Sequence, residues 1–202
     1  MAVKVEIRGN ADLRKAFRRF TPDLEKQLKK EIGAALRPVV RQAKGFVPQD
    51  SPMSGWRARS FSEAKFPMYN ASTITRGITY KTTPSKINEN GFSSMASIQN
   101  NSRVGAIFES AGRANPLGQP WVGPKAGSRS NKVSKSNNPH AGAKFIENLP
   151  PLVSSLKGRG RLIYRAWAAS QGRAEGATMK AIDSALTQFE TRAAQAPLKK
   201  VA

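Results

Sequence analysis

Apolar and polar residues alternate at the N-terminus and then recur at helical spacing. Residues 3–8 read Val-Lys-Val-Glu-Ile-Arg, which predicts a strand with one buried face. Residues 12–20 and 21–47 then carry apolar side chains every three to four positions, as amphipathic helices do. The second helix begins on Thr21-Pro22, an N-cap followed by proline at the first helical position. Pro38 lies inside this helix, and we expect a kink there because proline lacks the backbone donor.

The middle of the chain predicts strands separated by loops. Residues 48–73 contain prolines and scattered aromatic residues without periodicity, which indicates an irregular loop. Strand-like runs follow at 74–82, 93–99 and 102–109, and with the first strand they predict an antiparallel meander. From 111 to 143 the chain is rich in Gly, Ser, Asn, Pro and Lys. A loop of this length within a domain is typical of a segment that is functional or orders on a partner.

Helical spacing returns over residues 161–194. Its expected apolar stripe consists of Ile163, Ala166, Trp167, Met179, Ile182, Leu186 and Phe189. These elements predict an α+β fold, in which a kinked N-terminal helix and a long C-terminal helix pack a small antiparallel sheet and long loops protrude. The length of 202 residues fits one domain spanning 1–202, from which a flexible basic loop extends at about 111–143.

Charge is the most unusual bulk property of the chain. Lys and Arg number 34 against 13 Asp and Glu, which gives a net charge of +21. The excess is spread along the sequence instead of forming a basic tail, so we assign it to the folded body and its central loops. Two interpretations follow: a phosphate-rich partner, or a solvated surface that keeps subunits apart until they assemble.

The sequence lacks the residue clusters that catalysis or metal binding requires. Cysteine is absent, and the single histidine, His140, has no acidic neighbour before Glu147, whereas zinc needs three or four ligands. The glycine spacing matches no phosphate-binding loop. We expect a non-enzymatic protein with no cofactor and no metal. No apolar run has the length of a membrane span or a signal peptide, so we also expect cytoplasmic synthesis and no membrane partner.

Four local patterns follow one another in an informative order. They are Val47-Pro48 closing the long helix, Ser54-Gly55-Trp56-Arg57 with Ser60 beyond, Ala106-Ile107-Phe108-Glu109-Ser110-Ala111-Gly112 ending the last predicted strand, and Lys144-Phe145-Ile146 before the C-terminal helix. In this chain the patterns follow a short strand and a basic amphipathic helix. In this order of elements the chain resembles the tail-completion, or head-to-tail connector, family of long-tailed double-stranded-DNA bacteriophages. The sequence departs from the family in the long basic loop between Arg113 and Ala143, and in a longer, more aromatic loop after Pro48.

The resemblance implies a structural virion protein of the neck, made in the host cytoplasm and located between head and tail. Such a protein is a subunit of a homo-oligomeric ring, usually a hexamer, that joins the tail to the DNA-filled head. Its neighbours would be a head-closure or adaptor protein and a tail-terminator or tail-tube protein, and genomic DNA would be contacted without sequence specificity. The alternative that composition supports is a free-standing basic nucleic-acid-binding protein that reads no sequence and joins no particle.

Two sets of loop residues are candidate contacts. Apolar anchors carry much of the energy of an interface, so the bulky apolar residues of the loops are candidate subunit or partner contacts. For the aromatic ones among them, packing in the subunit's own core is the alternative. The bulky apolar candidates are Trp56, Phe61, Phe66, Tyr69, Trp121 and Val122. The candidate contacts to an acidic partner or DNA are Lys125, Arg129, Lys132 and Lys135. We expect the long loop to be the main assembly element, because ordering costs about 1–2 kcal/mol per residue that its own contacts cannot offset.

Overall fold

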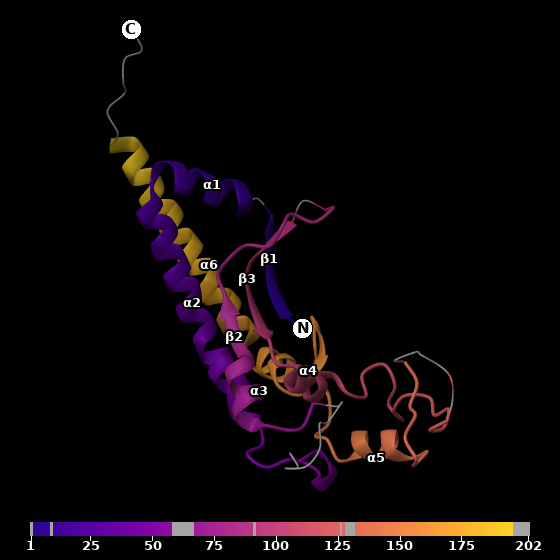
Figure 1. Ribbon diagram of the computed structural model, residues 1–202. Helices are drawn as coiled ribbons and strands as arrows, with labels where there is room; N and C mark the ends of the chain where they lie inside the picture. The colour runs from indigo at the N-terminus through magenta and orange to yellow at the C-terminus, as the bar shows by residue number, and fades with distance from the viewer. Residues whose placement is uncertain are drawn as a thin grey trace.

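Two long antiparallel helices lie side by side along the molecule, and a small sheet packs against them (Figure 1). The computed structural model describes residues 2–8, 10–57, 67–90, 92–125, 127 and 132–195, and of residues 2–8, 10, 11 and 20 it describes the backbone alone. The helices are α1 (Asn10–Phe20), α2 (Pro22–Gly45), α3 (Ala71–Gly77), α4 (Arg103–Ser110), α5 (Ala141–Glu147) and α6 (Ile163–Gln195), with a 3-10 turn at Ser54–Trp56. The strands are β1 (Ala2–Arg8), β2 (Ile78–Lys81), β3 (Phe92–Asn100), β4 (Val153–Ser155) and β5 (Gly158–Gly160).

The main sheet has the order β1-β3-β2, with β3 in the centre and both neighbours antiparallel to it. The register of β1 against β3 shifts between Val5 and Glu6, which marks a bulge. Ile78, Ala96 and Ile98 are buried. Because α2 and α6 both contact this sheet, these side chains join the helices in one core. The expected α+β class is therefore confirmed.

The α2–α6 pair supplies the most extensive contact between elements. Seven apolar positions predicted for α2 are buried, whereas Ala35, which belongs to the same predicted stripe, is half-buried. Burying a Leu or Ile side chain stabilises a fold by about 1.5–3 kcal/mol. The seven buried positions are Leu24, Leu28, Ile32, Leu36, Val39, Val40 and Ala43. Helix α2 continues through Pro38 to Gly45, so this row of contacts outweighs the loss of one backbone donor. The hydroxyl of Thr21, the predicted N-cap, makes no capping hydrogen bond.

The stripe predicted for α6 is correct at all but one position. Ile163, Trp167 and Ile182 are buried, but Met179 is 48% exposed. Thr178 takes the buried position instead, and its hydroxyl donates to the carbonyl of Ala174 at 2.7 Å. This bond satisfies the polar group inside the helix, so the smaller polar residue can face the core.

Two predicted strands are wrong, because capping side chains start helices there. Residues 74–77 of the expected strand 74–82 belong to α3, where Asn70 Oδ1 accepts from the backbone N–H of Thr73 at 2.7 Å, and β2 is the part of the expected strand that is extended. The expected strand 102–109 is α4, where Ser102 Oγ accepts from the N–H of Gly105 at 2.9 Å. The β4–β5 hairpin was not predicted, since strands of three residues show no alternation.

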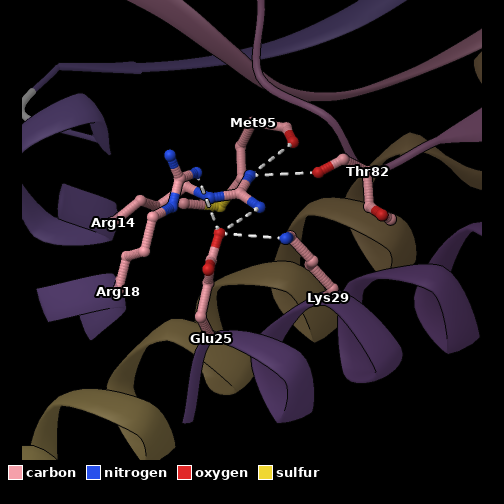
Figure 2. Close-up of polar contacts among 6 residues, drawn as sticks. All are labelled: Arg14, Arg18, Glu25, Lys29, Thr82 and Met95. Atoms are coloured by element: carbon pink, nitrogen blue, oxygen red, sulfur yellow. Dashed lines mark hydrogen bonds and ion pairs between the residues drawn. The ribbon is translucent and has the colours of Figure 1, made fainter. Parts of the chain in front are cut away.

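A buried ionic cluster ties α1 to α2 and to the sheet (Figure 2). Glu25 Oε1 lies 3.6 Å from Arg14 Nη2, 3.3 Å from Arg18 Nη2 and 2.9 Å from Lys29 Nζ. Arg14 is only 2% exposed. Its Nη1 donates to the carbonyl of Thr82 at 3.0 Å, at the end of β2. The Arg14 guanidinium thus lies buried between α1, α2 and the sheet. Its positive charge requires the Glu25 carboxylate as a neutralising partner.

The cluster lowers the pKa of Glu25 against the effect of its surroundings. Burial acts to raise this pKa, but hydrogen bonds from Arg18 and Lys29 outweigh it, and the net shift is downward. A folded-state pKa below the unfolded value gives stability that is full above the unfolded pKa. That stability is lost as the pH falls through the folded pKa.

We predict that Glu25→Gln lowers the free energy of unfolding by about 3 kcal/mol at neutral pH, because it leaves the buried Arg14 charge uncompensated. Glu31→Gln on the same helix is the control, since Glu31 is partly exposed and accepts only from Gln27, and should change stability by less than about 0.5 kcal/mol. Urea unfolding at neutral and acidic pH checks both variants. The difference between wild type and Glu25→Gln should shrink as the pH falls, and a constant difference would contradict this account.

Candidate functional site

The long loop predicted to carry function leaves the fold next to a buried carboxylate, Glu109, which is fully buried at the end of α4. Its Oε2 accepts from the backbone N–H groups of Leu162 and Ile163 at 2.6 and 3.2 Å, and its Oε1 accepts from that of Tyr164 at 3.0 Å. These donors belong to the first turn of α6, where a negative charge also meets the positive end of the helix dipole. Burial raises the pKa of Glu109, while these N–H groups and Arg113 oppose the shift.

Two arginines, Arg161 and Arg113, lie near Glu109 where the loop begins. We call these three residues the root of the loop. Arg161 is 3% exposed, and its Nη1 donates to the carbonyls of Phe108 and Ala111 at 3.1 and 2.8 Å. Burial lowers its pKa, and the charge of Glu109 acts in the opposite direction. The Arg113 guanidinium lies 4.8 Å from the centre of the Tyr164 ring, a cation–π contact. The chain segment that enters the loop is therefore held to the start of α6 by polar groups.

We call residues 111–140 the arm; its described part is 111–125, 127 and 132–140. Figure 1 shows it projecting, with α5, from the end of the molecule opposite the C-terminus. The arm is folded back on itself, because the N–H of Val122 donates to Ser134 O at 3.0 Å and that of Ser134 to Pro120 O at 2.8 Å. Trp121 Nε1 donates to Ser136 O at 2.9 Å. The arm therefore makes hydrogen bonds of its own, and the expectation that such contacts do not offset the cost of ordering it stays a prediction.

Glycine allows the arm to approach α5 closely. Gly118 has a φ of +83°, and a Cβ there would lie 2.6 Å from the Gly142 backbone. Next to Gly118 and further along the arm, Leu117, Trp121 and Val122 are 82%, 47% and 39% exposed. We call these three residues the apolar tip. Leu117 was not among the predicted contacts, although it follows the same signal, a bulky apolar residue in a Gly- and Pro-rich loop.

The other predicted aromatic contacts divide into two groups. Trp56 and Tyr69 are 2% and 6% exposed and pack against each other in the core, with ring centres 5.2 Å apart. Both residues therefore pack in the subunit's own core, which was the alternative to a partner contact. Trp56 Nε1 also donates to Pro67 O, and the Trp56 ring stacks on Phe108. The predictions for Phe61 and Phe66 fall outside the described residues.

The predicted basic contacts lie on the arm itself. Lys125, Lys132 and Lys135 are exposed, while Arg129 falls outside the described residues. His140 is exposed at the start of α5, and its backbone N–H donates to Asn138 Oδ1 at 2.8 Å. In the described part of the chain, no three of the residues His, Asp and Glu gather as metal ligands would. Over the same residues, no helix has both the length and the apolar character that crossing a membrane requires.

We expect replacement of Glu109 to destabilise the root of the arm. In Glu109→Gln an amide NH₂ replaces one carboxylate oxygen and faces backbone donors of α6, which should cost about 2–3 kcal/mol of unfolding free energy. Glu147→Gln, at an exposed carboxylate on α5, is the matched control and should be nearly neutral. Chemical denaturation measures both. Equal stabilities of the two variants would show that the hydrogen bonds to Glu109 do not hold α4 to α6.

Comparison with known proteins gave no match to any family model, curated protein or solved structure. The connector resemblance therefore stays a prediction.

Proposed function

We propose that this protein is a structural, non-enzymatic subunit of a head-to-tail connector or tail-completion ring, which joins a phage tail to its DNA-filled head. The observation that carries the proposal is the arm. A segment whose start is held by Glu109 and Arg161 projects from the rest of the molecule (Figure 1) and carries the exposed apolar tip, Leu117, Trp121 and Val122. Solvated bulky side chains on a projecting element are typical of a surface that a partner covers.

A projecting arm also suits the geometry of a ring. The arm and the surface that receives it are different parts of the subunit, so the contact is heterologous, and such contacts close into rings when the rotation between copies allows it. The exposed lysines beside the tip, Lys125, Lys132 and Lys135, would then face an acidic surface of the neighbour or of an adjoining head-closure or tail-terminator ring.

The rival function, a free-standing nucleic-acid-binding protein, explains the arm less well. Phosphate groups are bound by cations and hydrogen-bond donors, which gain nothing from Leu117 or Val122. Trp121 could stack on an unpaired base, but the aliphatic side chains Leu117 and Val122 have no aromatic face to do so. The tip is therefore better matched to a protein surface, and we place the protein in the neck of the virion.

Deletion of residues 115–140, closed by a short Gly-Ser linker, should leave a folded subunit, because every described helix and strand lies outside the deletion. Circular dichroism should show the helical signal of the wild type. In a phage that depends on this protein, the deletion should yield separate tails and filled heads. Unfolding of the deleted protein, or normal infectious particles, would contradict the proposal.

A narrower variant separates the apolar tip from the rest of the arm. Leu117→Ala, Trp121→Ala and Val122→Ala together should change the unfolding free energy by less than about 1 kcal/mol, since the side chains are exposed. Joining of heads to tails should fall at least tenfold, because anchor residues dominate interface energy. Ile87→Ala with Leu156→Ala, two exposed apolar residues in other loops, is the control and should join normally. Equal joining by the two sets would remove the tip from the proposal.

A further inference from the structure

The solvent face of α2 carries a row of cations that the proposed function has not used. Because α-helical positions repeat every 3.6 residues, these side chains fall within about 60° of arc and extend over roughly 27 Å of the helix. The five residues are Lys26, Lys30, Arg37, Arg41 and Lys44, and we call them the α2 basic row. The first four are exposed, and Lys44 is half-buried.

Tyr80 fills the gap in the middle of the row. Between Lys30 and Arg37 this face has Gly33, where a Cβ would lie 3.0 Å from Tyr80 Cε2, so only glycine lets the ring from β2 approach. Arg37 Nε lies 3.5 Å from the Tyr80 hydroxyl, at the limit of a hydrogen bond. The phenol therefore continues the row with a further hydrogen-bonding group, and the sheet holds it in place.

Carboxylates of α2 do not neutralise the row. Asp23 lies in the first turn and pairs with Arg192 of α6, and Glu25 is buried on the inner face. Glu31 accepts from Gln27, lines a groove between α2 and α6, and also lines a hollow with Lys26 and Lys30. Among the described residues no carboxylate forms an ion pair with a residue of the row, so its cations stay available to an anionic partner.

The chemistry of the row indicates which polyanion fits it. Protein interfaces need a buried apolar centre, but the exposed non-polar residues of α2 over this length are small, namely Ala34, Pro38 and Gly45. Single-stranded nucleic acid is held by stacking on aromatic faces, and the ring that joins the row, Tyr80, packs against Gly33. Duplex DNA needs neither, since its backbone presents about one negative charge per 1.7 Å of axis to any straight line of cations.

We infer that the α2 basic row, with Tyr80, is a binding surface for the phosphate backbone of duplex DNA, independent of sequence. Lysine and arginine side chains on a rigid helix would contact successive phosphates and release their counterions. In the proposed ring the DNA would be the genome held in the neck, and that identification rests on the proposed function. The binding surface itself does not rest on the arm.

The test compares two variants of equal charge. Lys26→Gln, Lys30→Gln, Arg37→Gln and Arg41→Gln remove four cations from the row, and Lys15→Gln, Lys86→Gln, Lys144→Gln and Lys157→Gln remove four exposed lysines from other elements. Fluorescence anisotropy with a short random-sequence duplex, over a series of salt concentrations, gives the affinity and its salt dependence. Lys26→Gln with Lys30→Gln provides a milder variant that leaves the Arg37 contact with Tyr80 intact.

The row variant should bind the duplex at least about tenfold more weakly than wild type, with a salt slope smaller by about 3–4, since each phosphate contact contributes about 0.9. For Lys26→Gln with Lys30→Gln, the decrease in salt slope should be about half as large. The variant with four lysines replaced on other elements should keep a duplex affinity within about threefold of wild type. Equal losses in both four-site variants would mean that net charge alone binds DNA, and would overturn the inference.

Titration with poly-glutamate separates DNA from an acidic protein as the partner. Loss of poly-glutamate binding in the row variant without loss of duplex binding would assign the row to a protein and overturn the inference. The compared variants all keep the arm, so a difference in DNA binding between them does not arise from it. A row variant that loses DNA but still forms rings, and an arm deletion that binds DNA but joins no tails, distinguish the two proposals.

Discussion

The three hydrogen bonds that Glu109 accepts from the first turn of α6 determine how the arm is attached to the fold. A buried carboxylate is tolerated only where donors surround it, and here the donors are backbone groups that the helix start leaves without partners. Arg161 meets the carbonyls at the end of α4 from the other side. Together they join two helix termini far apart in sequence. The arm therefore begins from a rigid root that loop residues alone would not supply.

Buried and exposed cations have different surroundings in this strongly basic chain. Arg14 and Arg161 are almost fully buried, and each is compensated by a carboxylate or by several carbonyl oxygens. The α2 basic row is exposed, and its own face of the helix lacks a carboxylate partner over that length. The first arrangement stabilises the fold, whereas the second leaves charge available to an anionic partner.

The elements that could be predicted from the sequence are those with long periodic patterns. Helices α1, α2 and α6 and strands β1 and β3 follow the spacing of their apolar residues. Helices α3 and α4 could not be predicted from β-branched composition, because the caps at Asn70 and Ser102 decide the local structure. The root of the arm depends on contacts between residues about fifty positions apart, which no local pattern reveals. The α2 basic row was visible at helical spacing, but the Tyr80–Gly33 contact within it was not.

The central claim is that this subunit belongs to a ring at the neck of a phage particle, and electron cryomicroscopy of purified particles tests it most directly. Our account predicts density for the subunit in a closed ring between head and tail, with the apolar tip of each arm covered by a neighbouring protein and α2 turned toward the channel that holds DNA. Particles that lack the protein, or a ring in which every arm points into solvent, would contradict it.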